Sequence, residues 1–149
     1  MKRALVPGGF AAAAVLLLIH FASATNLVQL QSPAFVRSRG AAVQVTVTVA
    51  CDASSTGTVA ASSTPATATL TVKLTEKVGN GTAVGTGAAA SQDGDFPCDS
   101  GSHNIQVSVL PEPGTKAFRK GSAFGQATLK VCNPDCRSVS DARTIKLSN

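Results

Sequence analysis

The stretch from Phe124 to Leu147, FGQATLKVCNPDCRSVSDARTIKL, predicts two strands joined by a turn that two cysteines flank. Apolar or small residues alternate with polar ones from Gly125 to Val131. This period of two places one face of a strand on a core and the other in water. Asn133, Pro134 and Asp135 all favour turns, so the chain should reverse between Cys132 and Cys136.

The Cys-x3-Cys spacing at 132 and 136 fits a local disulfide, or half of a zinc site. Beyond a cleaved leader, the chain offers only His103 and two other cysteines as further soft ligands. We therefore favour the disulfide.

The first 24 residues predict a secretory signal peptide. Lys2 and Arg3 precede an apolar run over 10–21, and Ala22-Ser23-Ala24 matches a signal-peptidase site. Cleavage after Ala24 leaves residues 25–149, enough for a single domain. No later stretch is apolar enough for a membrane helix. We expect a secreted, extracellular protein without a membrane span.

Composition narrows the functional classes. All four cysteines follow the leader, and an even number in an oxidising compartment predicts disulfides. The formal charge of +5 falls to about +3 without Lys2 and Arg3, too mild to indicate a nucleic-acid partner. Trp and Tyr are absent, which disfavours binding by aromatic stacking on sugars or single-stranded nucleic acids.

Alternating patterns predict seven strands and no helix. They cover 27–35, 43–51, 68–74, 82–90, 104–109 and the two strands of the 124–147 hairpin. Pro33 marks the first as an edge strand. Gly79-Asn80-Gly81 predicts a tight turn, although Asn80-Gly81-Thr82 also matches a glycosylation sequon. Asp141 and Arg143 fall where apolar residues are expected, and we interpret them as a short ion pair at a bulge or an edge. Seven short strands between turns predict an all-β fold, a seven-stranded antiparallel immunoglobulin-like sandwich with two disulfides.

Several segments together resemble small secreted immunoglobulin-like domains of actinobacteria. They are VQVTVTVACD at 43–52, FPCD at 96–99, FRKGSA at 118–123, and ATLKVC at 127–132 followed by Cys136 and RTIKL at 143–147. The resemblance implies the sandwich fold and is nearly silent on activity. A weaker resemblance, in the layout of 131–147, is to neocarzinostatin-type carriers, which hold a chromophore in a cleft. The second disulfide of that family is local, whereas Cys51 and Cys98 are far apart.

The strand order also predicts which cysteines pair. In a seven-stranded sandwich the second and fifth strands are antiparallel neighbours, so Cys51 after the second should meet Cys98 before the fifth. Cys51 shares the parity of the core valines, while Cys132 lies on the polar parity. We expect the bridges Cys51–Cys98 and Cys132–Cys136.

Catalytic chemistry is poorly represented. His103 is the one histidine after the leader, and no Gly-x-Ser-x-Gly elbow, phosphate loop or dinucleotide fingerprint is present. We expect no enzymatic activity and no cofactor. Asp52, Asp93, Asp95 and Asp99 should gather near the Cys51–Cys98 bridge, either as turn-forming residues, which we favour, or as calcium ligands.

Loop charges should sort to the two ends of the strands. Acidic residues at the disulfide-bearing end are Asp52, Asp93, Asp95, Asp99 and Asp135, and basic residues at the other are Arg37, Arg39, Lys77, Lys116, Arg119 and Lys120. The candidate binding residues are the first four of these acids with Arg119 and Lys120. We expect a monomeric, non-catalytic binding or structural module of the cell surface or medium, with an extracellular or cell-envelope partner. The alternative is a small-molecule carrier of the neocarzinostatin kind.

Overall fold

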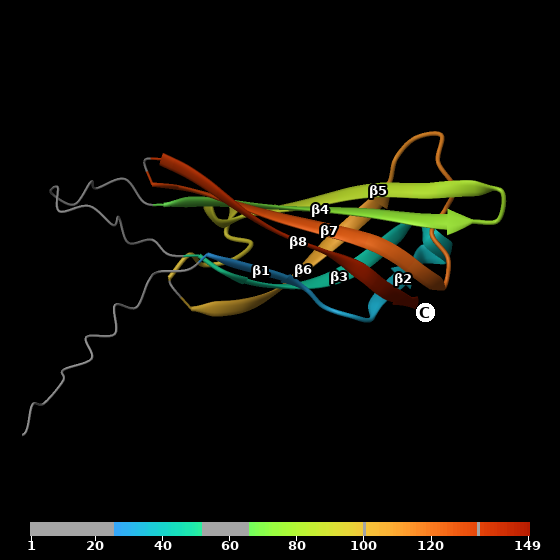
Figure 1. Ribbon diagram of the computed structural model, residues 1–149, viewed down its shortest axis with the longest axis horizontal. Coiled ribbons are helices and arrows are strands. Elements are labelled where there is room, and N and C mark those ends of the chain that lie inside the picture. The colour runs from blue at the N-terminus through green and yellow to red at the C-terminus, as the bar shows by residue number, and fades with distance from the viewer. Residues whose placement is uncertain (1–25, 52–65, 100, 134) are drawn as a thin grey trace, which may run out of the picture.

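The computed structural model describes residues 26–51, 66–99, 101–133 and 135–149, and its strands form one continuous curved sheet (Figure 1). The predicted signal peptide and Asp52 lie outside the described residues. The elements in chain order are β1 (Leu27–Leu30), β2 (Ala34–Arg37), η1 (Ser38–Gly40), β3 (Ala42–Ala50), β4 (Thr67–Val78), β5 (Gly81–Ala90), η2 (Ser91–Asp93), β6 (Ser102–Pro111), β7 (Gly121–Asn133) and β8 (Asp135–Ser148). None of the helices in the described ranges is long and apolar enough to cross a membrane.

The sheet closes on itself, so the predicted sandwich is wrong. Going round the barrel, the strands follow the order β3, β6, β5, β4, β7, β8, β2 and back to β3, while β1 pairs with the other half of β3. Neighbouring strands are antiparallel except β2 and β8, which are parallel. The result is a seven-stranded mixed β-barrel, in which one sheet encloses the core that two packed sheets were expected to cover.

Glycines on β5 make one of the closing pairings feasible. β5 pairs with β6 at two positions, Gly85 with Pro111 and Thr86 with Leu110. A Cβ at Gly85 would lie 2.5 Å from the carbonyl oxygen of Leu110, and one at Gly87 would collide with the carbonyl oxygen of Ser108. Glycine weakens a strand interior, but at these two positions its lack of a side chain lets two backbones meet closely.

The strand predicted over 27–35 is divided in two. β1 pairs with the second half of β3, Leu27 opposite Ala50, and β2 pairs with the first half, Arg37 opposite Ala42. The chain between them contains Pro33, which follows a cis peptide bond. The other six predicted strands are confirmed, and each extends beyond its predicted bounds at one end or both.

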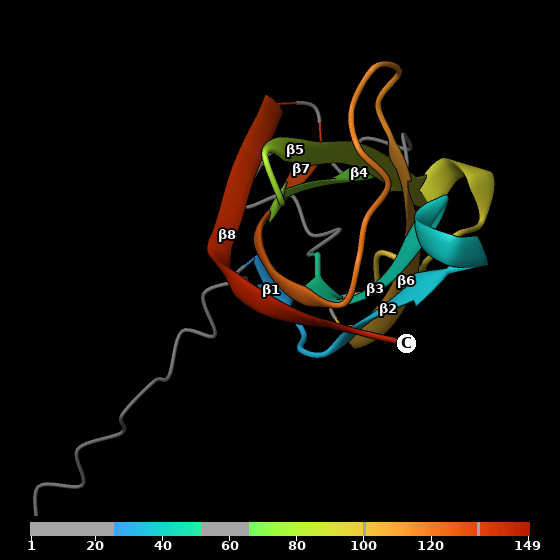
Figure 2. The same cartoon turned by 90° about the vertical axis from the view of Figure 1, so that its right-hand side faces the viewer.

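The barrel interior is filled with aliphatic side chains. Every second residue of β3 from Val43 to Val49 is fully buried, as is every second residue of β4 from Ala68 to Leu74. At one end, Phe118 from the loop after β6 closes the core and is 1% exposed. Figure 2 shows this loop, in orange, crossing the opening of the barrel.

Candidate functional site

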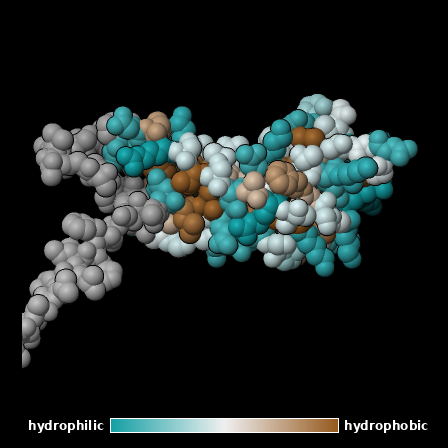
Figure 3. Space-filling view, viewed as in Figure 1, coloured by the Kyte–Doolittle hydropathy of each residue, from teal (hydrophilic) through white to brown (hydrophobic). Residues whose placement is uncertain are grey.

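Cationic side chains gather at the end of the barrel opposite the disulfides, as predicted. This basic end comprises six exposed residues, Arg37, Arg39, Lys77, Lys116, Arg119 and Lys120. They come from the end of β2, η1, the end of β4 and the loop over 112–120, which the topology brings together. In Figure 3 this end, on the right, has a mostly hydrophilic surface.

The loop over 112–120 is fixed to the barrel at its apolar residue. The backbone N–H of Phe118 donates a hydrogen bond of 3.2 Å to the carbonyl oxygen of Gly40. Gly40 has a φ of +93°, and a Cβ there would collide with the carbonyl oxygen of Phe118. Glycine is therefore required both for the backbone conformation and for the close approach.

Buried Glu76 holds the basic part of the same loop. Its side chain is 4% exposed, and Oε2 accepts a hydrogen bond of 2.9 Å from the backbone N–H of Arg119. On the other arm of the loop, the backbone N–H of Lys116 donates to the carbonyl oxygen of Thr82 at 3.1 Å. These bonds position the backbone while the side chains of Arg119 and Lys120 remain exposed to solvent.

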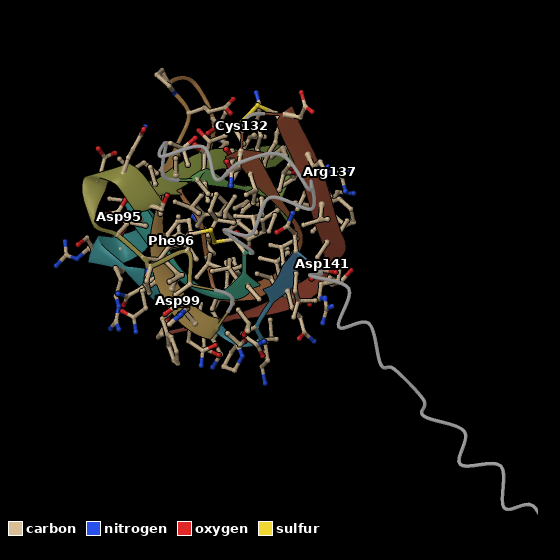
Figure 4. All side chains as sticks on the ribbon, turned by 90° about the vertical axis from the view of Figure 1, so that its left-hand side faces the viewer. Asp95, Phe96, Asp99, Cys132, Arg137 and Asp141 are labelled. Carbon is tan, nitrogen blue, oxygen red and sulfur yellow. A yellow bond between two sulfur atoms is a disulfide. The ribbon has the colours of Figure 1, made fainter. Side chains whose placement is uncertain are left out.

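Both predicted disulfides are present at the opposite end, which we call the disulfide end. Cys51 pairs with Cys98, and Cys132 with Cys136. The reason given for the first bridge also holds, because β3 and β6 are antiparallel neighbours and Cys51 is buried. Figure 4 looks onto this end and shows Asp95, Phe96 and Asp99 on one side, with Arg137 and Asp141 along β8 on the other.

The predicted acidic residues are engaged in local contacts. Oδ2 of Asp95 accepts the backbone N–H of Ala90 at 2.8 Å, and the Asp95 N–H donates to the Ala90 carbonyl oxygen at 3.3 Å. Asp93 is exposed at the end of η2. Asp95 therefore shapes the loop after β5, which agrees with its interpretation as a turn-forming residue.

Among the described residues of the disulfide end, Asp99 is the one whose side chain contacts a histidine. Its Oδ1 lies 2.7 Å from Nε2 of His103 and accepts the backbone N–H of Gly101 at 2.9 Å. The hydrogen bond from His103, followed by that from Gly101, lowers the pKa of Asp99 below its usual value of 3.8. In the part of the chain that the structure describes, no serine hydroxyl completes a catalytic triad with this pair.

Metal coordination was the other interpretation of the acidic loop. Within the described ranges, no three His, Cys, Asp or Glu side chains come together as a metal site. Asp52, the fourth acid of the predicted cluster, is not among these residues.

A crevice of about 350 Å³ lies where β5 and β6 diverge beyond their two paired positions. Ala88 and Ala89 line it on one side, residues 104–108 on the other, and Asp95 borders it. Its volume is at the lower end of the range for small-molecule pockets, and its lining mixes apolar residues (Ala88, Ala89, Ile105 and Val107) with polar ones (Asp95, Asn104, Gln106 and Ser108).

Sequence reasoning missed the residues that hold the basic end together. Phe118 is the one aromatic residue in the loop over 112–120. A single aromatic residue in an otherwise polar loop was the available signal that its side chain is buried. Glu76 lies on the apolar parity of β4, two residues after Leu74, but the predicted strand ended at Leu74, so its burial was not predicted. Comparisons with protein-family models, with curated proteins and with solved structures found no match to this chain.

Proposed function

We propose that this chain is an exported, non-catalytic binding module whose basic end binds anionic polymers of the cell surface. The observation that carries the proposal is the assembly of six exposed cationic side chains at one end of a closed barrel. Three of them, Lys116, Arg119 and Lys120, stand on a loop whose backbone is anchored by Phe118 and Glu76. A fixed loop presents charge without a large entropic cost of ordering on binding.

The chemistry of the basic end suits a repeating polyanion. Lysine and arginine side chains attract phosphate and carboxylate groups over about 10 Å at moderate ionic strength. Among the described residues, two acids, Glu76 of β4 and Glu112 of the loop, lie at this end against six cations, so the end keeps a net positive charge. Envelope polymers that repeat phosphate or carboxylate groups are the partner class that this surface fits.

Retention on an immobilised anionic wall polymer tests the proposal. The double variant Arg119→Ser and Lys120→Ser should elute at clearly lower salt than the parent, because it removes two of the six cations. The loop should stay in place, because the backbone N–H that donates to Glu76 is kept. The matched control is Lys73→Ser with Lys130→Ser, which removes the same charge from exposed positions on the barrel wall. If both doubles elute together, overall charge explains retention and the basic end is not the binding surface.

For the carrier alternative, a candidate location among the described residues is the crevice between β5 and β6. The interior of the barrel is occupied by side chains of the core, so a chromophore has no comparable space along the described strands. Titration with apolar small molecules, followed by protection of Ala88 and Val107 in amide exchange, would favour a carrier role over polymer binding.

A further inference from the structure

The crevice between β5 and β6 opens where the pairing of these two strands ends. Their ladder joins Gly85 to Pro111 and Thr86 to Leu110, and among the described residues it goes no further. Residues 104–108 of β6 form one wall of the crevice beyond it. On its other edge β6 pairs with β3 over this whole length. The crevice therefore exposes one edge of a strand that is held in place along the other.

Even-numbered residues of β6 turn their backbone groups toward the crevice. A Cβ at Gly87 would collide with the carbonyl oxygen of Ser108, and the carbonyl oxygen of Leu110 lies against β5 in the same way. These carbonyl groups point away from β3. In a strand, the N–H and C=O of one residue face the same edge, and so do those of every second residue. The N–H and C=O groups of Asn104 and Gln106 therefore face the crevice.

The side chains of these two residues leave the edge uncovered. Oε1 of Gln106 accepts a hydrogen bond of 2.6 Å from Nε2 of Gln44, and Oδ1 of Asn104 accepts one of 2.7 Å from Oγ1 of Thr48. Both bonds draw the amide side chains toward β3, away from the crevice. On the opposite wall, Ala88 contributes only a methyl group. A ligand can thus reach the backbone of β6.

The wall formed by β5 also presents backbone groups, at Ala88. The carbonyl oxygen of Val84 accepts the N–H of Glu112, and Ala90 bonds Asp95 through both its N–H and its C=O. Even-numbered residues of β5 therefore face β6, and Ala88 lies between two that are already bonded. Within the described ranges the hydrogen bonds of Asp95 go to Ala90, so this loop residue does not pair with the edge of β6.

We propose that the crevice binds a short extended peptide, which pairs with β6 through Asn104 and Gln106. The donors and acceptors of these two residues repeat at an interval of about 6.8 Å. An extended peptide repeats its own backbone groups at the same interval, and strands added to an open edge are bound in this way. The volume of about 350 Å³ suits a few residues rather than a folded partner.

The two faces of the sheet determine which side chains the peptide can carry. Peptide residues opposite Asn104 and Gln106 would point outward, because those two side chains are exposed. The peptide residue between them, opposite Ile105, would point into the barrel, where Ile105 and Ala89 are buried. The core is filled with side chains at this level, so the inward residue should be as small as glycine or alanine.

Charge at the crevice favours a cationic peptide. Asp95 lines the crevice and is exposed to solvent. The carboxylate of Asp99 contacts His103, the residue before Asn104 on β6. Figure 4 shows Asp95 and Asp99 on the same side of the barrel. The outward residues of the peptide should therefore be lysine or arginine. This site lies away from the basic end and does not depend on polymer binding there.

Fluorescence anisotropy with the labelled peptide Lys-Ala-Lys-Ala-Lys tests the proposal. The protein should bind this peptide, and methylating the backbone nitrogens of its lysines should remove most of the binding, because those N–H groups would donate to β6. Lys-Leu-Lys-Leu-Lys and Glu-Ala-Glu-Ala-Glu should bind more weakly. Amide exchange at Gln106 should slow when the first peptide is bound. Failure of that peptide to bind, or equal binding of the methylated form, would overturn the proposal.

Two variants and their controls locate the site. Asp95→Asn keeps an acceptor for Ala90 and should weaken binding about threefold or more, whereas Asp93→Asn, at an exposed acid outside the crevice, should not. Ala88→Leu fills the crevice and should block the peptide. Its control is Thr71→Leu, because Thr71 lies opposite Ala88 on β4 and outside the crevice. Equal effects of a variant and its control would place the peptide elsewhere and refute the site.

Discussion

The carboxylate of Asp141 accepts a hydrogen bond of 2.8 Å from the backbone N–H of Leu30, 111 residues earlier in the chain. This bond crosses the seam between β1 and β8, which share no ladder. The same carboxylate binds Arg143 through both of its oxygens. The predicted Asp141–Arg143 ion pair is thus confirmed. Asp141 supplies a hydrogen-bond acceptor to β1 where β1 and β8 lie side by side without a ladder.

Replacing Asp141 should destabilise the barrel at neutral pH. Asp141→Ala leaves the N–H of Leu30, on a buried residue, without its acceptor, which costs about 1–3 kcal/mol of unfolding free energy. Asp141→Asn keeps an acceptor oxygen and should lose less. Urea unfolding measures both variants, and equal losses would show that the charge of Asp141 rather than its hydrogen bond to Leu30 matters.

The contribution of Asp141 should depend on pH. Partial burial raises its pKa, but the Leu30 N–H and Arg143 together lower it more, so the pKa lies below 3.8. A lowered pKa means that the stabilisation is complete above the unfolded value and is lost as pH falls through the folded one. The difference in unfolding free energy between the parent and Asp141→Ala should therefore be constant above about pH 5 and shrink in stronger acid. A difference that grows on acidification would contradict this.

Adding a methyl group where β5 meets β6 should strain the barrel. Gly85→Ala and Gly87→Ala each bring a Cβ against a backbone carbonyl of β6, and overpacking of this kind costs about 1–3 kcal/mol. Gly81→Ala is the matched control, because its Cβ would meet only the flexible side chain of Lys116. Thermal unfolding of the three variants should separate the first two from the third.

Removing the aromatic anchor should release the basic loop. Phe118→Ala empties a fully buried site and should cost about 3–5 kcal/mol. Phe118→Leu fills most of the space and should cost less. If the loop presents the charges as proposed, amide exchange at Arg119 should quicken in Phe118→Ala before global unfolding. If the amide exchange rate at Arg119 does not change, the hydrogen bond to Glu76 alone holds the loop.

The two disulfides should differ in their contributions. The chain-entropy relation assigns up to ~4 kcal/mol to the Cys51–Cys98 bridge, which spans 47 residues, and about half of that to Cys132–Cys136, which spans four. Pairwise replacement with serine, followed by urea unfolding, gives both values. A larger loss from the short bridge would indicate that it orders the hairpin in the folded state.

Much of the local structure was predictable. The alternation in 43–49, 68–74 and 105–109 identifies strands with one buried face, because side chains on a strand alternate between its two sides. The cysteine pairing followed from the expected antiparallel pairing of the strand before Cys51 with the strand after Cys98 and from the parity of Cys51. The gathering of the basic residues at one end followed from the alternating strand directions. The Asp141–Arg143 pair followed from two charges on a parity that is otherwise apolar.

By itself, then, the sequence determined which segments are strands, which face of each is buried and which cysteines meet. Only the tertiary structure decided that the sheet closes. A sandwich and a barrel bury the same alternating residues, so no local pattern separates them. Closure depends on contacts between distant segments, the approach of Gly85 to Leu110 and the parallel pairing of Ala34 with Leu147. The acceptor that Asp141 offers to Leu30 has the same origin, because it exists only once β8 lies beside β1.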